Sequence, residues 1–82
     1  MKIAGWEVPP ALICILEKRM RERSFDASEL RGAAWSSGLL PKSHVIDHAY
    51  IQDEIGTRII AKYSREKKIV RAFGRSWCWR IE

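Results

Sequence analysis

Apolar residues recur every three to four positions in the segment ALICILEKRMRER, residues 11–23, and this is the spacing of one face of an α-helix. Pro9 and Pro10 precede it, and proline suits a first helical turn because its missing N–H is not needed there. Glu17 and Arg21 are four residues apart on the polar side, where opposite charges attract. The pattern predicts a helix whose buried face is formed by Leu12, Ile13, Leu16 and Met20.

A second helix is expected over roughly residues 27–36, after a short extended break at residues 24–26. Asp26 and Glu29 have the spacing of a capping box, in which the aspartate accepts a backbone N–H and the glutamate reaches back. Gly38 is a natural end, because glycine adopts positive φ without steric cost. The helix would bury Leu30, Ala33 and Ala34, and its small residues would let another helix approach closely.

A third helical pattern follows a turn at residues 39–43 and runs from about Ser43 through Tyr63. We expect Gly56 to kink or split this helix. The apolar arc holds Val45, Ala49, Ile55, Ile59, Ile60 and Tyr63. The opposite arc holds Asp47, Glu54, Thr57 and Arg58.

The chain ends with two segments, IVRAF and SWCWRI, on either side of Gly74-Arg75, a pair that suits a two-residue type II′ hairpin turn. That register places Val70 opposite Trp79, and paired residues share a face. The predicted core face is Val70, Ala72, Trp77, Trp79 and Ile81. The predicted outer face is Arg71, Phe73, Cys78 and Arg80. We therefore interpret the two tryptophans as core groups rather than as base-stacking groups.

These elements predict an α+β fold with a three-helix core and a C-terminal β-hairpin. A chain of 82 residues is enough for one domain, residues 1–82. Residues 1–8 are expected to be a lead-in segment whose Trp6 packs back on the core.

Positive charge is concentrated in the last third of the chain. The net charge is +5, yet residues 1–57 carry seven Lys/Arg and eight Asp/Glu, a balance of −1. Residues 58–82 carry eight Lys/Arg and two acids, a balance of +6. Concentrated positive charge favours a polyanionic partner such as nucleic acid. A solubilising surface is the alternative.

Other chemistry finds little support in the sequence. Cys14 and Cys78 form no CxxC or Cys/His pattern, which argues against a zinc finger or a disulfide scaffold and fits a reducing compartment. We interpret Cys14 as a core residue and Cys78 as an exposed one. His44 and His48 have i,i+4 spacing without a third ligand, so no metal or cofactor is expected. Nucleophile, P-loop and paired-carboxylate motifs are missing from the sequence, so no enzymatic activity is expected.

The apolar run ALICIL has six residues, well below membrane-spanning length, and the first residues lack the pattern of a signal peptide. These features predict a cytoplasmic protein without a membrane partner.

The order of helix, short strand, helix, turn, helix and hairpin resembles the winged-helix (winged helix-turn-helix) superfamily of DNA-binding proteins over residues 9–82. The segments that carry the resemblance are ASELRGAAWSSGL, followed by a helix, and IVRAFGRSWCWRIE. It implies a third helix in the major groove and a hairpin wing on phosphates or in the minor groove. The residues that it places near bases are Lys42, Ser43, His44 and His48. Those that it places near the backbone are Arg65, Lys67, Lys68, Arg71, Arg75 and Arg80, with Phe73 exposed at the wing tip.

The predicted function is that of a small transcriptional or accessory regulator that binds duplex DNA and is nucleoid-associated. It is similar to the compact solitary regulators of bacteria and their phages, which commonly dimerise. The third helix carries Asp47, Asp53 and Glu54, and phosphates repel carboxylates. Either the start of that helix alone touches bases, or the wing leads, or the acidic face binds a protein partner. A protein-interaction module docking through Asp47 and Glu54, and an RNA-binding protein, are the alternatives.

Overall fold

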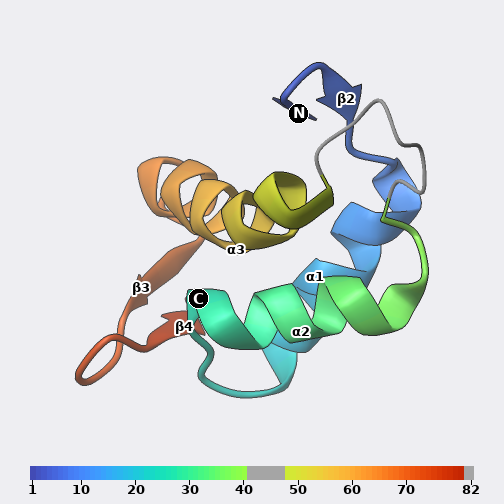
Figure 1. Ribbon diagram of the computed structural model, residues 1–82. Helices are drawn as coiled ribbons and strands as arrows, with labels where there is room; N and C mark the ends of the chain where they lie inside the picture. Colours follow the sequence, from blue (N-terminus) through green and yellow to red (C-terminus); the bar gives the residue numbers. More distant parts are fainter. Residues whose placement is uncertain (41–47, 81–82) are drawn as a thin grey trace.

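The computed structural model describes residues 1–40 and 48–80, and within them it has three helices and two small antiparallel hairpins, the predicted α+β class (Figure 1). The helices are α1 (Pro10–Glu22), α2 (Ala27–Ser37) and α3 (His48–Arg65). The strands are β1 (Lys2–Ile3), β2 (Trp6–Glu7), β3 (Ile69–Arg71) and β4 (Trp77–Trp79). No helix in these two ranges is long and apolar enough to cross a membrane. The predictions for Lys42, Ser43, His44, Val45, Asp47 and Ile81 fall outside the described residues.

The first two helices begin and end where their local signals predict. Pro10 occupies the first turn of α1, which buries Leu12, Leu16 and Met20 as expected, whereas Ile13 is only partly buried. The Asp26 carboxylate accepts the N–H of Glu29 (2.8 Å), and Gly38 ends α2 with a φ of 72°. The Glu29 carboxylate pairs with Arg19 of α1 instead of reaching back as in a capping box. That ion pair joins α1 to α2.

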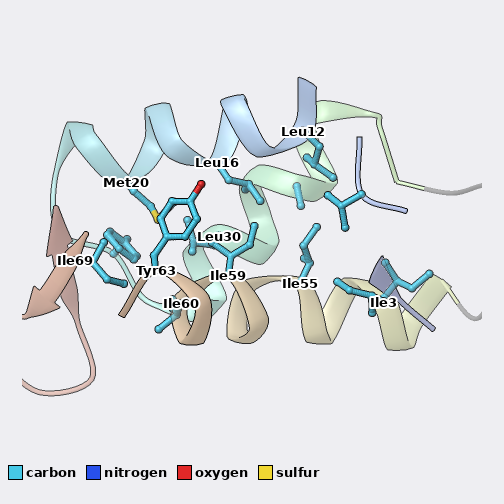
Figure 2. Close-up of a cluster of buried hydrophobic side chains, with 14 residues drawn as sticks. Ile3, Leu12, Leu16, Met20, Leu30, Ile55, Ile59, Ile60, Tyr63 and Ile69 are labelled. Atoms are coloured by element: carbon cyan, nitrogen blue, oxygen red, sulfur yellow. The ribbon is translucent and has the colours of Figure 1, made fainter. Parts of the chain in front are cut away.

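A single apolar core lies between the three helices (Figure 2). It is closed at one end by Ile69 of β3 and at the other by Ile3 of β1. The helical members are Leu12, Leu16, Met20, Leu30, Ala34, Ile51, Ile55, Ile59, Ile60 and Tyr63. Both hairpins are therefore held on the helices by burial of one of their own isoleucines.

Residues 1–8 form a hairpin, which the sequence had suggested only as a lead-in segment. β1 and β2 pair with Ile3 opposite Trp6, and the ring of Trp6 packs against the core as predicted. Ala4 and Gly5 connect them with φ values of 51° and 80°, the signs of a type I′ turn. Alanine is a poor signal for such a turn because its Cβ disfavours positive φ, so the hairpin was not recognised.

The hairpin of β3 and β4 forms where it was predicted, but its register differs from the prediction by one residue. Val70 lies opposite Cys78 rather than Trp79, and Arg71 lies opposite Trp77. A shift of one residue moves each side chain of a strand to the other face. Val70 is consequently 42% exposed instead of buried. Arg71 shares a face with the tryptophans, which also corrects the prediction.

A bulge beside the turn causes this shift. The N–H of Ser76 donates to the carbonyl of Phe73 (3.1 Å) and closes the predicted turn, in which Gly74 has a φ of 61°. The carbonyl of Ser76, however, accepts the N–H of Ala72 (3.0 Å). Two residues, Ala72 and Phe73, thus stand opposite one, as in a β-bulge. Ile69 therefore takes the buried position that the prediction gave to the next residue.

Phe25 ties the second edge of this sheet to the helices. Its N–H donates to the carbonyl of Trp77 (2.9 Å), and the N–H of Trp77 donates to the carbonyl of Phe25 (2.7 Å). The predicted short extended break between α1 and α2 is thus a strand-like bridge. Because Phe25 is fully buried, β4 is fixed to the core at this point.

Two further residues correct the sequence predictions. Gly56 does not split α3, which runs through it. A Cβ at Gly56 would lie 2.5 Å from the carbonyl oxygen of Ala27, so glycine permits the close approach of α2 to α3. Cys14, expected in the core, is exposed, because the fully buried row of α1 is a narrow stripe at every fourth residue.

Candidate nucleic-acid interface

The wing, defined here as residues 69–79, consists of β3, its connecting loop and β4, and it projects from the helices at the lower left of Figure 1. Residues 67–80, the wing with its flanks, carry no acidic residue. The cations in this stretch are Lys67, Lys68, Arg71, Arg75 and Arg80. An uncompensated positive charge on a projecting hairpin attracts polyanions.

The tip of the wing exposes a single large apolar side chain. Phe73 is 80% exposed, as predicted, while the backbone around it is closed by the two hydrogen bonds of Ser76. The ring is therefore presented to solvent on a short, hydrogen-bonded loop.

Arg71 is anchored on the wing itself. Its guanidinium carbon lies 5.0 Å from the centre of the Trp77 ring, within the range of a cation–π contact. Stacking occupies one face of the guanidinium and leaves the N–H groups at its edge able to donate to an anion. The bulge that turned Arg71 toward Trp77 therefore keeps its charge at the surface.

Arg75 lines a shallow groove where the wing, the start of α2 and the middle of α3 meet. The groove has a volume of about 360 Å³ and is lined by Asp26, Ala27, Ser28, Thr57, Ile60, Arg75 and Trp77. Thr57 is exposed on α3. The structure thus brings one wing arginine next to an exposed residue of the third helix, as an interface shared by both elements requires.

The base of the wing forms a second concavity of about 430 Å³, lined by Glu17, Arg21, Glu66, Lys67, Lys68, Trp79 and Arg80. Arg21 comes from α1 and lies over the Trp79 ring at 4.5 Å. Part of the charge is compensated, since Lys68 pairs with Glu66 (3.3 Å). The hydrogen bond from Lys62 (2.9 Å), helped by Lys68, lowers the pKa of the Glu66 carboxyl.

Arg65 lies apart from the other predicted cations. It lines a third concavity, of about 570 Å³, together with Lys2 of the N-terminal hairpin and with Arg58 and Lys62 of α3. The predicted phosphate-contacting residues other than Arg71 therefore line three different concavities instead of one continuous patch. The sequence could not reveal this, because the direction of each side chain depends on the register and on helix packing.

Two of the carboxylates that argued against a role for α3 in DNA binding, Asp53 and Glu54, are paired. Asp53 forms an ion pair with Arg31 of α2 (3.2 Å), and Glu54 pairs with Arg58 one turn later (3.6 Å). The second pair follows from the i,i+4 spacing alone, whereas the first requires the packing of α2 on α3. Local neutralisation weakens the repulsion that these two residues would exert on phosphates.

Of the four residues predicted to contact bases at the start of the third helix, the structure describes only His48. His48 is the first residue of α3, and Lys42, Ser43 and His44 lie outside the described residues. Within residues 1–40 and 48–80, no group of three or more His, Cys, Asp or Glu side chains is placed to hold a metal ion.

Sequence reasoning missed several exposed groups near these surfaces. The i,i+4 spacing identifies Arg21 only as a partner of Glu17, and Arg21 does lie 3.9 Å from that carboxylate. Lys2 has no role in the sequence prediction, because residues 1–8 carry no strong signal of a hairpin.

Comparison of the chain with protein families, with curated proteins and with solved structures gave no match.

Proposed function

We propose that this protein is a winged-helix protein that binds duplex DNA, with the wing as its leading contact, and that it acts as a transcriptional or accessory regulator in the cytoplasm. The observation that supports this most is the charge of the wing and its flanks, five cations and no acid over residues 67–80. Lys67, Arg75 and Arg80 form no ion pair with any residue in the described ranges. Their charges are available to a polyanion.

The arrangement of elements supports duplex DNA in particular. The groove lined by Arg75 and Thr57 places the wing beside the exposed side of α3. In a winged-helix protein this relation allows the helix to enter the major groove while the wing reaches the adjacent backbone or minor groove. Paired charges at Asp53 and Glu54 reduce the cost of bringing α3 near phosphates.

A protein-interaction module remains the alternative proposal, with Asp47 and Glu54 as the docking face. It has less support, because the Glu54 carboxylate is already engaged by Arg58. Asp47 lies outside the described residues. RNA binding is distinguished by competition in the experiment below.

The test is a duplex-DNA titration at several salt concentrations, with single strands and RNA as competitors. We expect wild-type binding to weaken steeply with salt, because phosphate contacts release counterions. Arg71→Glu/Arg75→Glu should weaken binding by about 100-fold or more and reduce the slope of log K against log salt by about 2.

Lys18→Glu is the matched control for the single variant Arg75→Glu. Both replace an exposed cation and change the net charge equally, but Lys18 lies on α1 and lines none of the three concavities. Lys18→Glu should bind much better than Arg75→Glu. A wild-type protein that fails to shift duplex DNA at low salt would falsify the proposal.

A further inference from the structure

Phe73 has a feature that charge alone does not explain. At 80% exposure it is the most exposed large hydrophobic side chain among the described residues, and it lies in the loop between β3 and β4. Apart from Arg75, the other residues of the loop are small, namely Ala72, Gly74 and Ser76. The ring contributes nothing to the core, in contrast to Trp77 and Trp79, which pack against it.

Backbone hydrogen bonds close the loop that carries the Phe73 ring, so the ring projects from an ordered loop. The bulge at Ala72 and Phe73 is held by the N–H of Ala72 on the Ser76 carbonyl (3.0 Å), and the turn by the N–H of Ser76 on the Phe73 carbonyl (3.1 Å). Bulges redirect a side chain at the end of a strand pair. Because the loop is closed by two hydrogen bonds, little order has to be gained when the tip meets a partner.

The flanking charges indicate what kind of partner the ring meets. Arg71 and Arg75 stand two residues to either side of Phe73. Arg71 is stacked on Trp77, which holds its guanidinium near the loop. An apolar ring between two cations is complementary to a partner that has an apolar interior with anions on both sides of it. In duplex DNA the stacked base pairs lie between two phosphate backbones.

We propose that Phe73 inserts as a wedge between adjacent base pairs from the minor groove, with Arg71 and Arg75 on the phosphates at either side. This inference rests on the proposed function. The minor groove is about 6 Å wide, which admits a side chain at a hairpin tip and excludes a helix. Apolar wedges of this kind partly unstack a base step and kink the duplex toward the major groove.

A wedge has a consequence for the sites that the protein selects. Unstacking is least costly at pyrimidine–purine steps such as TA and CA, which are flexible. The wing should therefore prefer duplexes with such a step, even without hydrogen bonds to base edges. Recognition at this point would depend on the deformability of the DNA.

The experiment measures the bend by energy transfer between dyes at the two ends of a duplex of roughly 25 base pairs with one central TA step. We expect the wild type to shorten the end-to-end distance and to prefer this duplex to one with an AA step. Phe73→Ala should abolish the bend and the preference, and weaken binding to the TA duplex roughly tenfold. Phe73→Leu, which keeps an apolar wedge, should retain most of both.

Trp35→Ala is the control, since it removes another exposed aromatic ring, at the surface of α2. It should leave the bend unchanged. Circular dichroism verifies that each variant is folded, and the exposure of Phe73 makes a folding defect unexpected.

The outcomes separate the wedge from the proposed function. Wild-type protein that binds no duplex overturns both. Wild-type protein that binds a duplex without bending it, or Phe73→Ala that bends it fully, overturns the wedge alone. Loss of binding to anionic phospholipid vesicles on Phe73→Ala, with duplex binding and bending intact, also overturns it and assigns the tip to a lipid surface.

Discussion

Lys67 adopts a backbone conformation that lysine rarely takes. Its φ is 62°, two residues after the last residue of α3, and the N–H of Lys68 donates to the carbonyl of Tyr63 (2.9 Å). This is the left-handed residue of a helix C-cap, where glycine is usual because it has no Cβ. The side chain also lines the basic concavity at the base of the wing.

Lys67→Gly should raise the free energy of unfolding by about 1 kcal/mol, because the left-handed strain is relieved. Urea denaturation measures the change. Lys67→Ala removes the same charge but keeps a Cβ, so it should give no such gain. Equal stabilisation by both variants would attribute the effect to charge repulsion and refute the backbone explanation. Both should weaken DNA binding modestly under the proposed function.

At the scale of the helices and strands, local signals and packing decided different things. Helix starts and ends depend on interactions within a few residues. The proline start of α1, the Asp26 cap and the Gly38 end of α2 were all predicted for this reason. The register of β3 on β4 was not predicted. The turn at Gly74 has the expected hydrogen bond, but the bulge at Ala72 and Phe73 beside it shifts the pairing by one residue. Burial of Ile69 against the helices favours the bulged register, in which Val70 faces solvent.

The contact between α2 and α3 depends on a missing side chain. Gly56→Ala should destabilise the protein by about 2 kcal/mol, because the new Cβ would lie 2.5 Å from the Ala27 carbonyl oxygen and the helices would have to separate. Gly32→Ala is the matched control: Gly32 is helical, and nothing lies within 4 Å of its added Cβ. That variant should be more stable by about 0.5–1 kcal/mol.

Thermal denaturation of the two alanine variants tests the contact directly. Melting temperatures that move in opposite directions from the wild type support it. If both variants melt above the wild type, the close approach of α2 to α3 is wrong.

At the scale of the whole molecule, Tyr63 connects α3, α1 and the wing. Its side chain is almost fully buried, and its hydroxyl donates to Oε1 of Glu17 on α1 (2.5 Å). Its ring meets that of Trp79 edge to face, with centroids 6.0 Å apart. Burial, followed by the hydrogen bond and the charge of Glu17, raises the pKa of the Tyr63 phenol well above its ordinary value.

The stability of the protein should therefore fall in strong base. The folded state keeps the phenol proton where the unfolded chain has lost it, so folding binds protons and the free energy of unfolding decreases as pH rises. The contribution of neutral Tyr63 is complete below the ordinary tyrosine pKa of about 10 and declines above it. Urea unfolding between pH 8 and pH 11 measures the slope.

Tyr63→Phe should cost about 1 kcal/mol at pH 8, because the Glu17 carboxylate loses its donor, and should flatten the slope above pH 10. The same alkaline slope in Tyr63→Phe and the wild type would show that other groups cause it.

The features of the candidate site also fall into those that the sequence predicts and those that depend on tertiary packing. The concentration of cations after residue 57, the place of the hairpin and the exposure of Phe73 at its turn follow from residue order, and each was predictable. The distribution of those cations over three surfaces, the pairing of Asp53 with Arg31 and the addition of Arg21 and Lys2 were not. Each of the latter depends on which elements pack together, and side chains distant in the chain carry no local signal of that.

Residue order alone thus specified the three helices, the closing hairpin and the charge that it carries, since caps, helical periodicity and turn residues act over a few positions. Tertiary packing chose the register of the wing, the burial of Ile69 in place of Val70 and the stacking of Arg71 on Trp77. The physical reason is that alternative registers differ little in local energy. Burial against helices that are distant in sequence decides between them, and with them which side chains of the wing face a partner.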